Sequence, residues 1–111
     1  MSSSVQHKIT TIKKRLLIRS ILRKGFRIHT KFGIFFLGKE NSEGFSFAVL
    51  IKKSIGKAVH RNYCKRIVRE YIRNNKLRFG NFNSIIFLFN YNGAVNYYSL
   101  STDFDIKIKA L

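Results

Sequence analysis

Acidic side chains are scarce in this 111-residue sequence. Only Glu40, Glu43, Glu70, Asp103 and Asp105 oppose 22 lysines and arginines, so the formal net charge is +17. A charge imbalance of this size opposes compaction through self-repulsion, and a polyanionic partner is the economical explanation. Nucleic acid is the first candidate, followed by an anionic membrane or an acidic protein.

Paired carboxylates are missing as well, which argues against a nuclease that works alone. Such an enzyme usually holds divalent metal with clustered carboxylates, and no two acids here are spaced for joint metal binding. His7, His29 and His60 have no companion at metal-ligand spacing, and no glycine-rich loop suited to cradle phosphates is present. We therefore expect no catalytic residue, no metal site and no cofactor bound by side chains.

Cysteine and long apolar runs are also rare. The single cysteine excludes an internal disulfide framework and fits a reducing cytoplasm. No apolar run approaches the roughly 20 residues that span a bilayer, and the first residues lack the apolar core of a secretory signal. We expect a cytoplasmic protein with no membrane association, built as one domain over residues 1–111, with residues 1–10 as a mobile arm.

Apolar periodicity predicts an α+β fold. The predicted elements, in chain order, are a helix that begins between residues 11 and 16 and ends at 24, strands at 26–30, 32–37 and 47–51, a helix from the 52–56 turn to about residue 76, a strand at 84–89 and a helix after residue 97. This α-β-β-β-α-β-α order predicts a small two-layer sandwich with a four-stranded mixed sheet. Residues 38–44 are expected to form a polar hairpin loop.

The segment after Tyr97 allows two interpretations. Leu100, Phe104, Ile108 and Leu111 fit one face of a helix, whereas Phe104, Ile106 and Ile108 fit a strand. We favour the helix because Ser99 and Ser101 offer N-caps, and because Asp103 and Asp105 would then lie near its positive end.

The helix after the 52–56 turn divides sharply into two faces. At 100° per residue, an arc of about 140° holds seven polar residues, namely Arg61, Asn62, Lys65, Arg66, Arg69, Arg73 and Lys76. The opposite side holds His60, Cys64, Ile67 and Tyr71, with Val68 and Ile72 at its border. This pattern is typical of an amphipathic helix packed on a sheet. We expect His60 to be packed or half-buried and Cys64 to be an inert buried thiol.

A cationic helix face is often only solvated surface, but here Glu70 is the single acid able to pair with Arg66 or Arg73. Arginine forks and lysine charges suit phosphate oxygens, so the face favours recognition of a folded nucleic acid by backbone and shape. Aromatic rings on or near the sheet either fill the core or stack unpaired bases; these are Phe26, Phe32, Phe35 and Phe36. Tyr63, at the edge of the cationic arc, is the better stacking candidate.

A specific motif runs through the same stretch. It joins a strand, a lysine-rich turn and one basic helix face, and consists of Lys53, Ile55, Gly56, Lys57, Ala58, Val59, Arg61, Asn62, Lys65, Arg66 and Arg69. In these residues the chain resembles the protein subunit of bacterial ribonuclease P. The basic arm at Lys13, Lys14 and Arg15 and the helix end at Lys24-Gly25 extend the resemblance. Tyr63 departs from it, because the family has a second arginine there, and Lys52 and Ser54 stand where the family more often has serine and lysine.

The resemblance implies an RNA-based enzyme that removes the 5′ leader from precursor tRNA, with hydrolysis performed by a large RNA subunit and its bound Mg²⁺. It implies an RNA-subunit-binding set of Lys57, Arg61, Asn62, Lys65, Arg66, Arg69 and Arg73. It also implies a leader-binding cleft between the first helix and the sheet, at Ile18, Leu22, Phe36, Lys52 and Lys53. Ile18 and Leu22 stand where many relatives have phenylalanines. No obligatory protein partner is expected.

The resemblance further implies a left-handed strand–helix–strand crossover around the basic helix, a connection that is right-handed in about 98% of proteins. Two other classes remain open from the residues alone. One is a non-catalytic RNA-binding module of the ribosomal or RNA-chaperone type, and the other is a self-sufficient nuclease.

Overall fold

The computed structural model describes residues 10–11, 15–39, 44–109 and 111. The expected mobile arm up to residue 9, the basic residues Lys13 and Lys14, and the loop acids Glu40 and Glu43 lie outside the described residues. The elements are β1 (Thr10–Thr11), α1 (Arg15–Lys24), β2 (Phe26–His29), β3 (Gly33–Gly38), β4 (Ser46–Ile51), α2 (Ala58–Asn74), the 3-10 helix η2 (Lys76–Phe79), β5 (Ser84–Phe89) and α3 (Tyr97–Ile108).

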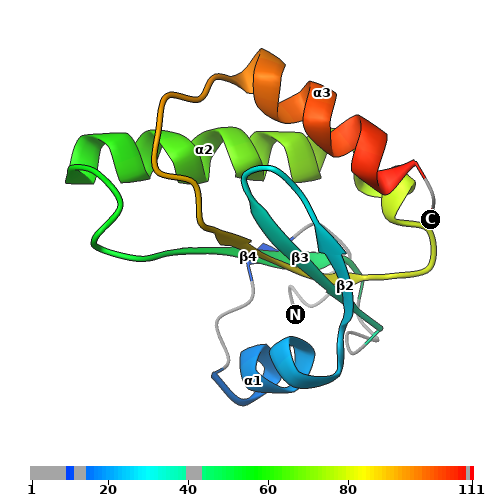
Figure 1. The fold of residues 1–111 in the computed structure, drawn as a ribbon. Helices are drawn as coiled ribbons and strands as arrows, with labels where there is room; N and C mark the ends of the chain where they lie inside the picture. The colour runs from blue at the N-terminus through cyan, green and yellow to red at the C-terminus, as the bar shows by residue number, and fades with distance from the viewer. Residues whose placement is uncertain (1–9, 12–14, 40–43, 110) are drawn as a thin grey trace, which may run out of the picture.

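One mixed sheet contains the four predicted strands, in the order β1-β4-β5-β3-β2 (Figure 1). The short strand β1 adds a fifth, because Thr10 and Thr11 pair in parallel with Ser46 and Phe47. β5 lies at the centre between β4 and β3, and this position explains its nearly continuous apolar sequence. None of the described helices is long and apolar enough to cross a bilayer.

The prediction of a hairpin at residues 38–44 is wrong. β3 and β4 are not neighbours, because β5 pairs with both of them, antiparallel to β3 and parallel to β4. The hairpin of this sheet is instead β2–β3, which is antiparallel and is joined by the turn at residues 30–32. Gly33 follows that turn, and a Cβ there would lie 2.1 Å from the Leu88 carbonyl oxygen, so the close strand approach requires glycine.

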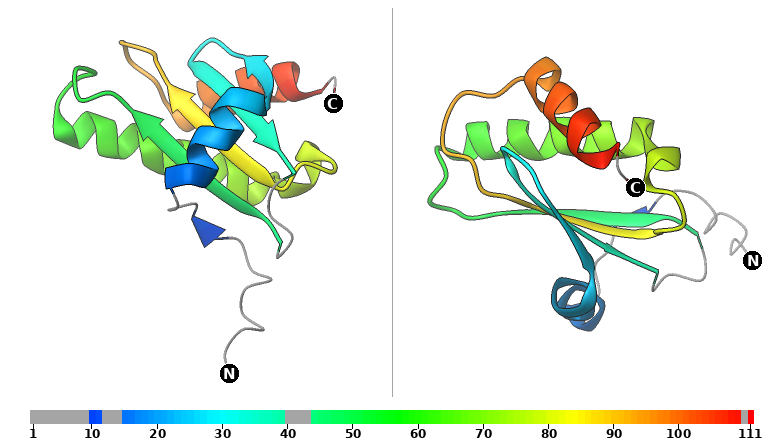
Figure 2. Two further views of the ribbon diagram at one scale, coloured as in Figure 1. Left: turned by 90° about the horizontal axis from the view of Figure 1, so that it is seen from below. Right: turned by 45° about the vertical axis from the view of Figure 1, so that its right-hand side comes forward.

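The β4–α2–β5 crossover is left-handed. In the left view of Figure 2, α1 lies in front of the sheet and α2 behind it, while β4 and β5 point the same way with β5 to the right of β4. Seen from the α2 side, the chain therefore moves leftwards from β4 to β5. This agrees with the unusual hand that the family resemblance implied.

Helices cover both faces of the sheet. α2 and α3 bury the main core, in which the largest side chains are Tyr71 and the phenylalanines at 32, 35, 47, 79, 87, 89 and 104. α1 lies on the other face and closes a smaller cluster of Ile21, Phe36, Ala48 and Ile86 (Figures 1 and 2). The α+β class is confirmed, with α1 forming a partial layer of its own.

The C-terminal segment is the helix α3, as predicted, but its cap differs from the prediction. Asn96 is the N-cap, and its side chain accepts a hydrogen bond from the Ser99 backbone N–H at 2.8 Å. Asp103 and Asp105 lie in the second half of α3, away from the positive end of the helix dipole, and make specific hydrogen bonds instead. The Asp103 carboxylate accepts from the Lys31 backbone N–H at 2.9 Å, and that of Asp105 accepts from the Tyr71 hydroxyl at 2.7 Å.

Candidate nucleic-acid interface

The cationic face of α2 lies on the outside of the molecule, as the sequence predicts, with each of its residues exposed or half-buried. Buried residues fix the orientation of the helix, namely Cys64, Ile67, Val68, Tyr71 and Ile72. On the outer side a shallow hollow of about 520 Å³ is lined by Val59, Asn62, Tyr63, Lys65, Arg66 and Arg69. A second hollow of about 570 Å³ is lined by Arg66, Arg69, Glu70 and Arg73. Because the hollows share Arg66 and Arg69, five predicted RNA-contacting residues form one continuous surface. We call it the α2 stripe: Asn62, Lys65, Arg66, Arg69 and Arg73.

The charges of the α2 stripe are not neutralised within the described part of the chain. The two ion pairs found there are Arg78–Asp105 at 3.5 Å and Lys107–Asp103 at 2.9 Å, so both C-terminal aspartates are occupied elsewhere. Glu70 is exposed and forms no ion pair with a described residue. The guanidinium and ammonium groups of the stripe are therefore available to an external anion.

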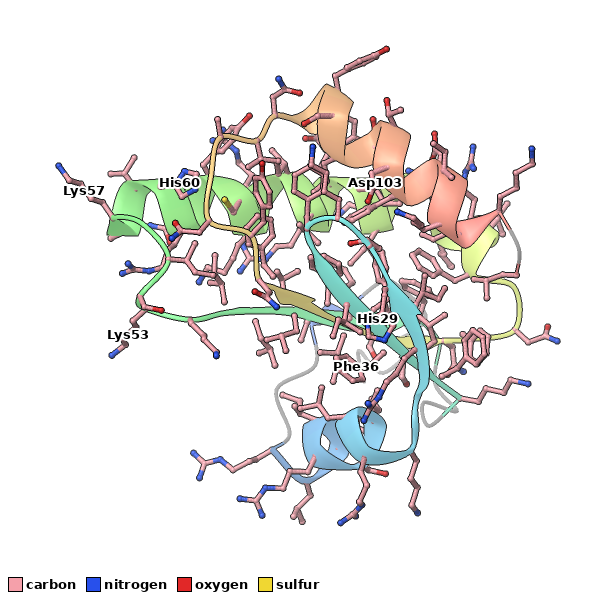
Figure 3. All side chains as sticks on the ribbon, viewed as in Figure 1. His29, Phe36, Lys53, Lys57, His60 and Asp103 are labelled. Carbon is pink, nitrogen blue, oxygen red and sulfur yellow. The ribbon has the colours of Figure 1, made fainter. Side chains whose placement is uncertain are left out.

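Arg61 makes contacts within the chain that the rest of the basic face does not make, and its contact with RNA stays a prediction. Its Nη1 donates to the carbonyl oxygens of Lys53 and Gly56, both at 2.8 Å. Gly56 has a φ of 62°, and a Cβ on it would lie 2.7 Å from the His60 ring. Arg61 thus holds the turn that precedes α2, and Figure 3 shows Lys53 and Lys57 pointing outward from this end of the molecule.

Tyr63 lines the first hollow, and it occupies the sequence position at which the family has arginine. Its side chain is half-buried against the main core, and the Arg66 guanidinium lies 5.3 Å from its ring centroid. This cation–π contact orders Arg66 over one part of the ring. A base that stacked on Tyr63 would therefore also meet the Arg66 charge, and the stacking role stays a prediction.

His60 and Cys64 are packed, as predicted, and form no nucleophilic site. Cys64 is fully buried, and its Sγ lies 3.5 Å from His60 Nε2. Burial raises the pKa of the Cys64 thiol above its ordinary value, which keeps it protonated and unreactive at neutral pH. No group of three His, Cys, Asp or Glu side chains that could hold a metal ion occurs among the described residues.

The predicted leader-binding residues fall into two groups. Phe36 is 6% exposed and packs in the α1 cluster, with Ile18 and Leu22 half-buried around it. The Arg27 guanidinium lies 5.3 Å from the Phe36 ring centroid and donates to the Leu22 carbonyl oxygen at 3.4 Å. Phe36 therefore supports α1 and does not present an open ring face. Lys52 and Lys53 are exposed after the end of β4.

A row of residues that the sequence analysis missed lies next to the α1 cluster on the same sheet face. The strand register places Phe36 beside Arg27, Ile86 and Ala48 in one row across the sheet. Two residues further along each strand, the same register forms a second row. The second row consists of His29, Ile34, Leu88 and Leu50, in order across β2, β3, β5 and β4. The three apolar members are half-buried and His29 is exposed. We call it the open row; the strand period of two, counted from Phe36, was the signal for it.

A basic helix face on one side of a mixed sheet and a half-open apolar row on the other define a small α+β protein of the nucleic-acid-binding class. The sequence comparisons agree with this class and specify it. The family model for ribonuclease P matches residues 7–108, and the chain belongs to this family.

The chain is similar to several ribonuclease P proteins. It is 34% identical over 67 residues to the ribonuclease P protein component of Fusobacterium nucleatum, a match that spans 60% of each chain. The structure of the RNase P protein from Staphylococcus aureus superimposes with a TM-score of 0.74 at 23% identity, covering 90% of this chain and 93% of that one. The RNase P protein from Thermotoga maritima gives a TM-score of 0.75 at 20% identity, covering 91% and 96%. At these identities the two structures support the shared fold.

Proposed function

We propose that this chain is the protein subunit of the RNA-based endonuclease ribonuclease P, which removes the 5′ leader from precursor tRNA. The observation that carries the proposal is the α2 stripe, whose cations form no ion pair with any described acid. Because the chain belongs to the ribonuclease P family, we infer that the RNA bound by this surface is the catalytic RNA subunit. Hydrolysis belongs to that RNA subunit, which supplies Mg²⁺ when assembled.

The α2 stripe docks on the RNA subunit. α2 has 17 residues, so at 1.5 Å per residue it extends for about 25 Å and can follow several phosphates of a folded RNA. The arginines give planar forks for phosphate oxygens, and Asn62 adds an amide that both donates and accepts. The Arg61 clamp adds to this surface by fixing the turn from which Lys53 and Lys57 extend.

The leader of the precursor tRNA binds on the opposite sheet face, along the open row. Ile34, Leu50 and Leu88 offer half-exposed apolar surface to unpaired bases, and His29 adds a polar group at the edge strand. Lys52 and Lys53 lie beyond Leu50 and can hold the phosphates of the same strand. α1 borders this surface, and Phe36 packs between α1 and the sheet.

The two surfaces give the protein a positioning role. The RNA subunit and the precursor tRNA are both polyanions and repel each other, and a strongly basic domain between them reduces that repulsion. The chain's own groups orient the leader while the RNA performs the chemistry. This role needs neither a cofactor on side chains nor an obligatory protein partner, and we assign it to the cytoplasm, in one domain.

The test is a cleavage assay with precursor tRNA and Mg²⁺, run with the full chain alone, the cognate RNA subunit alone, and both together. The proposal predicts cleavage that requires the RNA subunit and that the protein enhances at low salt. Cleavage by the protein alone would identify a self-sufficient nuclease instead. RNA binding without any enhancement would identify a plain binding module, and either result would overturn the proposal.

A further inference from the structure

One phenylalanine of this chain faces solvent. Phe26 begins the edge strand β2, and its side chain is 54% exposed, whereas the other ten phenylalanines are buried or half-buried. Its ring stacks on that of Phe82, with the centroids 5.8 Å apart and the planes 15° from parallel. The Lys39 ammonium lies 5.4 Å from the Phe82 centroid. An open aromatic face next to a cation is the usual platform for an unpaired nucleobase.

A hollow of about 290 Å³ adjoins this platform. It lies where η2 and the turn before β5 meet, and it is lined by Gly44, Phe45, Lys76, Leu77, Gly80, Asn81, Phe82 and Asn83. Phe82 belongs to both the hollow and the platform, so the two are continuous. Lys76 also lines the hollow, with its ammonium 5.9 Å from the Phe45 ring centroid.

The hollow continues the α2 stripe. Arg73 ends the stripe, and its guanidinium lies 6.0 Å from the centroid of Phe47 in β4, while the Lys76 ammonium lies over Phe45, which directly precedes β4. A strand that follows the stripe toward its C-terminal end therefore reaches Lys76, then the hollow and finally the Phe26 ring. Each step along this path offers a positive charge or an apolar wall.

We propose that an unpaired nucleotide of the RNA subunit binds at this end, with its base stacked on Phe26 and its flanking phosphates near Lys76 and Lys39. This inference rests on the proposed function and extends the RNA footprint beyond α2. Strand alternation assigns the site to the RNA subunit and not to the leader. Arg27 lies in the sheet face of the open row, so its neighbour Phe26 faces the α2 side.

Crosslinking identifies the occupant. A photoreactive benzoylphenylalanine replaces Phe26 in the full chain, which is then assembled with the RNA subunit and precursor tRNA and irradiated. We expect crosslinks to an unpaired position of the RNA subunit. The matched control carries the same group at Tyr98, which is 78% exposed on α3. Crosslinks only to precursor tRNA, or no more RNA-subunit crosslinking than from position 98, would overturn the inference.

Affinity measurements give a second, independent test. Phe26→Ala should weaken RNA-subunit binding by about 5- to 150-fold without changing its salt dependence, because the variant loses a stacking contact and no charge. Phe26→Tyr should retain binding, and Lys39→Ala should reduce the salt slope by about 1. If Arg69→Ala weakens binding and Phe26→Ala does not, the inference fails while the proposed function stands. If neither variant changes RNA binding, the proposed function itself fails.

Discussion

Replacing Arg61 by lysine separates the two roles of the basic face. The guanidinium Nη1 donates to the Lys53 and Gly56 carbonyl oxygens at 2.8 Å each, and these two hydrogen bonds hold the turn before α2. A lysine keeps the positive charge, but its Nζ ends a shorter side chain and lacks the fixed planar geometry in which Nη1 donates its two hydrogens to the two carbonyls. Arg61→Lys should therefore loosen the turn while leaving the net charge unchanged.

The magnitude follows from the two hydrogen bonds. A bond involving a charged group contributes about 1.5–3 kcal/mol to stability, and the half-exposed position of Arg61 places each of its bonds at or below the lower end. With one bond partly replaced by the lysine ammonium, the net loss is about 1–2 kcal/mol. For a domain of this size that loss lowers Tm by roughly 4–8 °C. Disorder of the turn should also weaken RNA-subunit binding by about 5- to 30-fold.

The assay compares Arg61→Lys with Arg66→Lys, because Arg66 is exposed and donates to no described carbonyl. Thermal unfolding and RNA-subunit affinity are measured for both variants at four salt concentrations. We expect the lower Tm only for Arg61→Lys, together with an unchanged salt slope. Equal Tm values for the two variants would show that Arg61 is an ordinary phosphate contact and not a clamp.

Four further predictions concern other parts of the molecule. Burial raises the pKa of Tyr71 above its ordinary value of 10, and the hydrogen bond to Asp105 and the Asp105 charge raise it further. The free energy of unfolding should therefore be independent of this group below pH 10 and fall above pH 10 by up to about 1.4 kcal/mol per pH unit. In urea unfolding at several pH values, Tyr71→Phe should flatten this fall, and it should lower the free energy of unfolding by about 1–2 kcal/mol at pH 7. Cys64 should resist iodoacetamide at pH 8 in the folded chain and react only after unfolding, and fast native labelling would contradict its burial. Ile34→Ser should weaken the binding of leader-carrying precursor tRNA severalfold, and tRNA without a leader is the control. An equal loss of affinity for both RNAs would refute this prediction. Phe36→Ala should lower the free energy of unfolding by about 3–5 kcal/mol through the cavity left under α1, and a loss below 1 kcal/mol would contradict its packing role.

Local patterns in the sequence predicted most elements because the physics that fixes them is local. The apolar run at residues 84–89 became the central strand β5, and the two faces of α2 lie as the 100° period indicates. The C-terminal helix was predicted correctly, but its cap was placed at the serines. Asn96 and Ser99 form the capping box, and Asn96 lies four residues before the apolar repeat, which begins at Leu100.

Features that depend on residues far apart in the chain could not be predicted from the sequence. The 38–44 loop joins strands that β5 separates, and no residue in that loop records the insertion of a strand 40 residues later. Arg61 looked like its neighbours on the helix face, because only the folded turn brings two carbonyls to its guanidinium. Phe36 and Phe26 are both phenylalanines near the sheet. Coverage by α1 buries one, and the edge position of β2 exposes the other.

The salt dependence of RNA-subunit binding tests the docking role of the α2 stripe most directly. The triple variant Lys65→Ala, Arg66→Ala, Arg69→Ala removes three charges from the stripe. The control Arg15→Ala, Arg19→Ala, Arg23→Ala removes the same number of charges from the exposed face of α1, on the other side of the sheet. We expect the stripe variant to reduce the slope of log affinity against log salt by about 3, with a much smaller change for the control. Equal slopes for the two variants, or an unchanged slope for the stripe variant, would contradict docking through α2.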